Sequence, residues 1–369
     1  MKTFFHSCIF AALLHSGFSI TANAQLPADS TASAMPHLVN GKSLFETDAI
    51  LEITLSGNVK ELLNDRAENS QYHPILLSYK GEDSSEVAIP VAMKTRGHFR
   101  KLKENCSYPP LQISFSKNDL LQSSVFKEQE KMKLVMPCKD DGYVIREWLV
   151  YKLYNLVSPK SFKARLVSVK MKDTKNKKTA VPFYGILLEE EKQMAKRNGL
   201  IPLNKKIQPA QTERQAFLNM AVFEYMTGNT DWGIQYLQNV KLLALDSNAV
   251  PIAVPYDFDH AGIVDAPYAN PAEELQMSSV RERRYRGFCI EDMQQFASVI
   301  NLYNSLKNEI YSTYTDCKLL DEKYIKTTIK YLDDFYATIN NPAALKKEFG
   351  YPCDKNGTGN IIIKGLREE

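Results

Sequence analysis

The sequence of 369 residues lacks the short motifs that mark several common kinds of site. It contains no Cys-x-x-Cys pair and no His-x-x-x-His spacing, so the usual zinc-binding patterns are absent. It has no Gly-x-Ser-x-Gly elbow and few histidines, which argues against a Ser-His-Asp hydrolase. It also has no Gly-x-Gly-x-x-Gly run, so an ordinary glycine-rich phosphate loop is not predicted.

Strong charge of one sign is also missing. Lys and Arg together number 46 and Asp and Glu 43, which gives a formal net charge of +3. This imbalance is too small to predict binding to nucleic acid or to an anionic membrane surface. Beyond the first two dozen residues, no apolar stretch approaches the length of a membrane helix, so we predict no membrane span.

The first residues have the pattern of an export signal. Lys2 precedes an apolar stretch over residues 4–20, and Ala22-Asn23-Ala24 is a small-x-small cleavage pattern. We therefore expect a signal peptide over residues 1–24, cleavage near Ala24, and a periplasmic or secreted mature protein. Residues 25–45 are rich in Ala, Ser and Pro and predict a flexible leader.

Six cysteines are present, and Cys8 would leave with the signal peptide. An oxidising compartment would permit disulfides between the other five, although an odd number leaves at least one unpaired or joined to another chain. Sequence alone does not set the connectivity. The pairs Cys106–Cys138 and Cys317–Cys353 fit, and burial as small apolar residues is an equal alternative.

Hydrophobic periodicity predicts a β-rich N-terminal part and a largely helical C-terminal part. Strands are expected over residues 50–56, 86–93, 111–115, 164–170 and 180–188. Helices are expected over 143–156, over 212–227 and through most of 291–349, with a restart at Asn341-Pro342. Thr212 and Gln215 predict a capping box, and Gly228 a helix stop. The predicted divisions are 46–190 (β-rich lobe), 191–350 (helical lobe) and 351–369 (tail).

The chemistry-bearing residues follow the helix that Gly228 ends. Asp231 lies in the next loop, and two short apolar runs, 240–245 and 250–256, predict a β-hairpin. A hairpin returns the chain to its start, so Asn239 before the first strand and Asp257 after the second should lie close together. The sequence therefore predicts three oxygen-bearing side chains at one mouth.

Phosphoryl transfer requires such a set. One carboxylate orients the attacking hydroxyl, while an amide oxygen and a second carboxylate hold Mg²⁺ against the nucleotide phosphates. Here these roles would fall to Asp231, Asn239 and Asp257. Any one of these residue types alone is common in turns and caps, so the prediction rests on the ordered set. The order of these features is that of the C-terminal lobe of kinases: a helix, a loop Asp, an Asn, a hairpin and a second Asp.

The segment resembles the spore coat protein H (CotH) family of secreted atypical kinases. That family has an Asn-x-x-Asp-Trp-type loop, a following Asn, and a Pro-aromatic-Asp-x-Asp motif. The chain has Asn229-Thr230-Asp231-Trp232, then Asn239, then Pro255-Tyr256-Asp257-Phe258-Asp259. The resemblance covers about residues 50 to 300. It implies a two-lobed protein-kinase-like α+β fold, Asp231 as catalytic residue, Asn239 and Asp257 as metal ligands with Asp259 as helper, and ATP and Mg²⁺ as cofactors.

Upstream segments match the family in order. Lys94-Thr95-Arg96-Gly97 resembles its basic-Arg-Gly element, residues 141–146 its Asp-then-Arg helix start, and residues 184–189 its Tyr-x-Gly strand that ends in Glu. The resemblance thus implies that Lys94, Arg96, Arg146 and Glu189 bind the nucleotide. Glu147 is a candidate partner of Lys94. The chain departs from the family after Gly97, where His98-Phe99-Arg100 replaces Asn-x-Ser, and at Leu187, which replaces an aromatic residue.

Several alternatives remain open at this level. The predicted acceptor is a Ser or Thr of a secreted or surface protein, but a small molecule or sugar is also possible. A non-catalytic interaction module is the alternative to an enzyme. The run Arg281–Arg286 contains four arginines and predicts a solvated, ion-paired loop, with contact to phosphates or an acidic substrate as the alternative.

Overall fold

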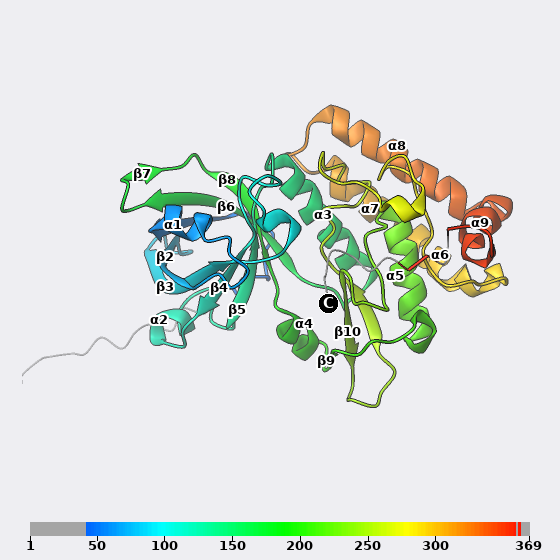
Figure 1. Ribbon diagram of the computed structural model, residues 1–369, viewed down its shortest axis with the longest axis horizontal. Coiled ribbons are helices and arrows are strands. Elements are labelled where there is room, and N and C mark those ends of the chain that lie inside the picture. Colours follow the sequence, from blue (N-terminus) through cyan, green and yellow to red (C-terminus); the bar gives the residue numbers. More distant parts are fainter. Residues whose placement is uncertain (1–41, 359–360, 363–369) are drawn as a thin grey trace, which may run out of the picture. The chain divides into compact units, whose positions relative to one another are not determined.

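The β-rich part of the chain closes into a barrel (Figure 1). The computed structural model describes residues 42–358 and 361–362. Seven strands follow the order β1-β2-β3-β4-β5-β8-β6, and β6 pairs in parallel with β1 to complete the ring. The short β7 extends β6 as a hairpin. The strands are β1 (Leu51–Gly57), β2 (His73–Lys80), β3 (Glu86–Thr95), β4 (Leu111–Phe115), β5 (Lys131–Val135), β6 (Ala164–Asp173), β7 (Lys178–Thr179) and β8 (Phe183–Leu188).

The expectation of a two-lobed protein-kinase-like fold is therefore wrong. The protein has an α+β fold made of a closed seven-stranded barrel and a mostly helical region. The closing contact pairs Leu51 with Val167 and Gly57 with Asp173, more than a hundred residues apart in sequence. Alternating hydrophobicity predicts strands but carries no information about such a distant parallel partner.

The barrel interior is a hydrophobic core of its own. Alternate residues of each strand point inward, as in β1, where Ile53 and Leu55 are buried while Glu52 is exposed. The other strands contribute Leu77, Met93, Ile113, Leu134 and Val169, among others, to the same cluster. Because the inward positions are apolar, the polar residues of β3, β4 and β5 lie on the outer surface, where they are free to line a site.

A second core joins the helical region to the outside of the barrel. Helix α3 (Gly142–Val157) contacts β6 and β8 on one side and α5 and α7 on the other. The boundary near residue 190 stays a prediction, and α3, which precedes it in sequence, packs in this second core. The remaining α-helices are α1 (Val59–Asn64), α2 (Asp119–Gln122), α4 (Glu191–Arg197), α5 (Arg214–Thr227), α6 (Ala297–Ser305), α7 (Lys307–Thr315), α8 (Glu322–Ile339) and α9 (Pro342–Phe349).

The predicted hairpin is present in a separate three-stranded sheet. Strands β10 (Val240–Ala244) and β11 (Ile252–Pro255) pair antiparallel, and β9 (Ile201–Leu203) adds to the other edge of β10. Val240 faces Pro255 in this register. The chain therefore returns to the residue after Asn239, as the sequence predicted.

Helix α5, which leads to the hairpin, begins differently from the prediction. The expected capping box of Thr212 and Gln215 is wrong, because Glu213 is the N-cap and its carboxylate accepts hydrogen bonds from the Gln215 and Ala216 amides. A carboxylate near a helix N-terminus also interacts favourably with the helix dipole. The expected helix end is confirmed, since Gly228 caps α5 in the left-handed region at φ 69°.

We expect Gly228→Ala to destabilise the protein by more than the roughly 1–2 kcal/mol that a left-handed backbone costs an L-residue. A Cβ at this position would clash with the Tyr331 hydroxyl oxygen, so the Tyr331 side chain or α8 would also have to move. Gly199→Ala is the matched control, because Gly199 has φ +66° and nothing within 4 Å of the added Cβ. Urea unfolding of both variants measures the difference, and equal losses would contradict the steric contribution.

The cysteines confirm one expected pair and correct the other. Disulfides join Cys106 to Cys138 and Cys289 to Cys353, while Cys317 is a free thiol. The candidate pair Cys317–Cys353 is therefore wrong. The predicted signal peptide, its cleavage position and most of the predicted leader lie outside the described residues. Among the described helices, none has the length and apolar character needed to cross a membrane.

Candidate functional site

The loop after α5 and the mouth of the hairpin form one hydrogen-bonded cluster. The Asn239 carboxamide nitrogen donates to the Asp231 carboxylate at 2.9 Å and to the Asp231 carbonyl at 2.8 Å. Gln238 donates to the other carboxylate oxygen of Asp231. The Tyr256 amide donates to the Asn239 carbonyl at 3.0 Å, which places Asp257 one residue from the cluster. The structure thus brings Asp231, Asn239 and Asp257 together, while their roles remain predictions.

Three residues of this region have an uncommon backbone conformation. Leu237, Asn239 and Asp257 have φ values of 51°, 48° and 66°, in the left-handed region. Non-glycine residues adopt it rarely, and such residues concentrate at functional sites, where the surrounding structure compensates their cost. Two of the three are residues that the sequence proposed as metal ligands. The Asp257 amide is fixed by a hydrogen bond to the Tyr151 hydroxyl at 2.9 Å.

The sequence did not identify Lys133, which is the cation at this cluster. Its ammonium group lies 3.1 Å from the Asp257 carboxylate. In the barrel register, Lys94 on β3 faces Gln112 on β4, and Gln112 faces Lys133 on β5. Lys94, the strand lysine that the sequence predicted for the nucleotide, therefore lies in the same row of the sheet as Lys133 but two strands away from it. Alternation over residues 131–135 was the available signal, and we did not predict that strand.

A cavity of about 220 Å³ is lined by Lys133, the ion-pair partner of Asp257, whereas Asp231, Asn239 and Asp257 are not among its lining residues. Its walls come from the outer face of the barrel and from the hairpin sheet. They combine cations, carboxylates and apolar side chains. The residues that line it include Arg96, Lys133, Phe162, Leu188, Glu189 and Tyr256.

Burial and neighbouring charges shift the pKa values of the Asp231 and Asp257 carboxylates in opposite directions. Burial raises the pKa of Asp231, and the nearby charges of Asp259 and Asp257 raise it further, against the attraction of His260. Burial also acts to raise the pKa of Asp257, but the charges of Lys133 and Arg100 outweigh it and hold this pKa below its ordinary value. Asp257 is therefore the firmly ionised member of the pair.

A buried ion network lies behind the cluster and contains Asp259. The Arg100 guanidinium lies 3.3 Å from the Asp259 carboxylate and 3.7 Å from the Glu147 carboxylate, and the Tyr268 hydroxyl donates to Asp259 at 3.2 Å. Burial and the charge of Asp259 raise the pKa of Glu147, against the attraction of Arg100. The idea that Glu147 orients Lys94 is wrong, because its cation is Arg100.

The other proposed nucleotide-binding residues have separate places. Arg96 and Glu189 line the 220 Å³ cavity, although Glu189 also pairs with Arg197 at 2.9 Å. The Lys94 ammonium lies 5.0 Å from the centre of the Tyr72 ring and is not among the cavity-lining residues. The Arg146 guanidinium lies over the Tyr324 ring and donates to the Val264 carbonyl at 3.2 Å. Neither Lys94 nor Arg146 therefore lines the cavity.

The expected ion-paired loop over the arginine run is wrong, while the alternative of contact with phosphates or an acidic substrate stays a prediction. None of its four guanidinium groups forms an ion pair within 4.0 Å among the described residues, and none lines the cavity. Each donates instead to backbone carbonyls, with Arg281 bonded to Gly262 and Arg283 to Met226. The run is thus a set of internal braces.

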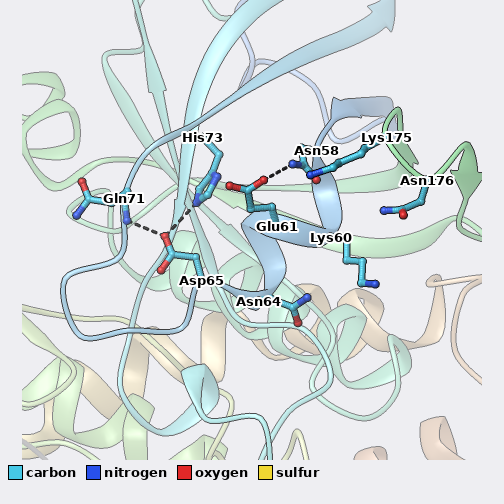
Figure 2. A pocket seen from close by; sticks show the side chains of 9 residues that line it. All are labelled: Asn58, Lys60, Glu61, Asn64, Asp65, Gln71, His73, Lys175 and Asn176. Carbon is cyan, nitrogen blue, oxygen red and sulfur yellow. Dashed lines mark hydrogen bonds and ion pairs between the residues drawn. The ribbon is translucent and has the colours of Figure 1, made fainter.

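A second, larger cavity of about 710 Å³ lies beside α1 and the β6–β7 turn (Figure 2), and no residue of the Asp231 cluster lines it. The nine residues that line it are polar, and most are exposed. The Asp65 carboxylate accepts hydrogen bonds from the Gln71 amide at 2.8 Å and pairs with the His73 ring at 3.0 Å (Figure 2). Because this lining has no buried apolar or aromatic side chain, the Asp231 cluster is the better candidate site.

Neither protein-family models nor curated proteins give a match to this chain. The resemblance to the CotH family therefore remains a prediction from the quoted motifs. Within the described part of the chain, no group of three or more His, Cys, Asp or Glu side chains could hold a metal ion. A cation at this site would have to be held by Asp257 and the Asn239 carboxamide oxygen, with further ligands from bound phosphates.

Proposed function

We propose that the protein is an exported CotH-like kinase that transfers the γ-phosphate of ATP in a Mg²⁺-dependent reaction. The observation that carries this proposal is the hydrogen-bonded contact between Asp231 and Asn239, together with the ion pair of Asp257 and Lys133, because Lys133 also lines the 220 Å³ cavity. A carboxylate, an amide, a second carboxylate and a lysine within reach of a mixed polar and apolar cavity form the donor set that phosphoryl transfer uses.

The residues fit the group that they would hold. Carboxylate and carboxamide oxygens are ligands that Mg²⁺ prefers, and Asp257 is ionised over the whole neutral range. Mg²⁺ would supply neutralisation of the phosphate charge when bound. Lys133 and Arg96 are the cations that would contact phosphates, and Phe162 and Leu188 would cover the base. Asp231, buried and held by Gln238 and Asn239, would orient the acceptor hydroxyl.

The acceptor would be a Ser or Thr of another secreted or surface protein. Export is supported by the N-terminal signal pattern and agrees with the two disulfides, which are common in oxidising compartments. Export is tested by determining the N-terminal sequence of the protein recovered from outside the cytoplasm, which should begin at Gln25.

One observation favours a second candidate, a non-catalytic binding module. Lys133 already neutralises Asp257 at 3.1 Å, and the Asn239 nitrogen is used by Asp231. A site in which these contacts persist would bind a partner without metal. Mg²⁺-dependent nucleotide binding distinguishes the two functions.

The test is a thermal shift with Mg·ATP on Asp257→Asn. A ligand at about 100 times its Kd should stabilise the wild-type protein by about 2.7 kcal/mol. Asp257→Asn should lose the Mg²⁺-dependent part of this stabilisation, because it removes the metal carboxylate while Asn tolerates the left-handed backbone.

Asp246→Asn is the matched control. Asp246 lies at the turn of the same hairpin, where its carboxylate accepts the Asn248 and Ala249 amides, so the same chemical change occurs at the far end. This variant should keep the full Mg·ATP shift. An unchanged shift in Asp257→Asn, or no shift in the wild-type protein, overturns the proposed function.

A further inference from the structure

Arg286 lies at the centre of contacts that no catalytic role explains. One guanidinium nitrogen, Nη1, donates to the Thr230 carbonyl and to the Trp232 carbonyl, the latter at 2.7 Å. These two carbonyls belong to the peptide groups that flank Asp231 and Trp232. A single nitrogen therefore fixes the backbone on both sides of the proposed catalytic residue.

The other nitrogen of the same guanidinium, Nη2, reaches the C-terminal segment, by which we mean the described residues 351–358 and 361–362. It donates to the Ile361 carbonyl at 3.2 Å. Arg286 thus joins the loop that carries Asp231 to a segment about 130 residues away in sequence. A lysine could not reproduce this arrangement, because its ammonium group is a single point of donation on a flexible stem.

The C-terminal segment is itself anchored near Arg286. Cys289, three residues after Arg286, forms the disulfide with Cys353. Arg284 donates to the Tyr351 hydroxyl at 2.9 Å and to the Thr358 hydroxyl at 2.7 Å. These contacts hold residues 351–358 against the arginine run.

The loop that carries Asp231 also has hydrogen bonds within itself. The Asp231 amide donates to the Asn229 side chain at 3.0 Å, and Gly233 and Gln238 exchange two backbone hydrogen bonds at 3.0 Å. These contacts fix the shape of the loop. Within the described residues, Arg286 is the side chain that fixes the Thr230 and Trp232 carbonyls to another part of the fold.

We propose that Arg286 is a positioning residue that couples the C-terminal segment to the Asp231 loop. The proposal rests on the proposed function, since it assigns Arg286 to the placement of the residue that would orient the acceptor hydroxyl. Displacement of about 1 Å in such a group reduces turnover by up to about 100-fold. The brace does not touch the nucleotide cavity, so nucleotide binding should be retained.

The experiment compares Arg286→Lys, Arg286→Met and Arg281→Lys. We expect Arg286→Lys to lower kcat by ~10-fold or more, with a KM for nucleotide within about twofold of the wild-type value. Arg286→Met should lower kcat further. Arg281→Lys is the matched control from the same run, because Arg281 donates to Gly262 and not to the loop, and its kcat should stay within about twofold.

A second measurement separates this proposal from the proposed function. Amide hydrogen exchange of Asp231 and Gly233 should be ~10-fold faster in Arg286→Lys than in wild-type protein or Arg281→Lys, whether or not the protein has kinase activity. The double variant Cys289→Ser/Cys353→Ser should accelerate the same amides, because it releases the segment that holds Ile361. Unchanged exchange in either variant, or equal effects of Arg286→Lys and Arg281→Lys, overturns the proposal.

Discussion

Asp231→Asn should abolish most phosphoryl transfer while leaving nucleotide binding nearly intact. The substitution keeps the shape of the side chain and one oxygen that can accept a hydrogen bond from Gln238 or Asn239. It removes the carboxylate that would accept the proton of the acceptor hydroxyl. General-base groups contribute about 10²–10⁴-fold to turnover, so kcat should fall by that factor. Transfer of labelled phosphate from ATP to co-secreted proteins measures kcat, and calorimetry measures the nucleotide affinity.

The control for this prediction is again Asp246→Asn, which should leave kcat unchanged because the hairpin turn is remote from the cluster. If Asp231→Asn kept more than about a tenth of the wild-type rate, the carboxylate would not have the role of a base. A loss of nucleotide affinity equal to the loss of kcat would place Asp231 in binding instead.

Arg100→Met should produce the largest loss of stability among single charge removals. The Arg100 side chain is 9% exposed, and its loss leaves the carboxylate of Asp259 buried without a cation. Removal of one partner from a buried ion pair costs about 3–5 kcal/mol, because the remaining charge stays desolvated. Urea unfolding should show this loss as a lower midpoint with an unchanged slope.

Two further variants test the cause of that loss. Arg100→Met combined with Asp259→Asn removes both charges and should recover a large part of the stability. Lys117→Met breaks the exposed pair with Glu130, whose side chains are 77% and 72% exposed, and should cost less than about 1 kcal/mol. If Arg100→Met cost no more than Lys117→Met, the network would not be a buried ion pair in solution.

Local structure followed from local sequence where the pattern was strong. Helix α3, the hairpin of β10 and β11, the Gly228 helix end and the Asn341 cap of α9 all agree with the prediction. The convergence of Asn239 and Asp257 followed from the hairpin alone, because an antiparallel pair brings its two ends together. The contact of Asp231 with Asn239 extends the same cluster.

Long-range pairing could not be predicted in the same way. Barrel closure depends on β1 meeting β6 in parallel, and two of the barrel strands, β2 and β5, were not predicted at all. Lys133 was missed with β5, although it is the cation on Asp257. Arg100 belongs to the segment His98-Phe99-Arg100, for which no motif predicted a role, and its partners Glu147 and Asp259 are remote in sequence. The ion-paired loop expected over Arg281–Arg286 was also wrong, because its arginines donate hydrogen bonds to backbone carbonyls.

Calorimetric titration of the wild-type protein with a non-hydrolysable ATP analogue tests the central claim most directly. With Mg²⁺ present, we predict saturable binding at one site. Chelation of Mg²⁺ should weaken it by at least ~10-fold, because Asp257 and Asn239 then lose the ion that links them to the phosphates. Absence of binding, or binding of equal affinity with and without Mg²⁺, would contradict the proposed Mg²⁺–nucleotide site at Asp231, Asn239 and Asp257.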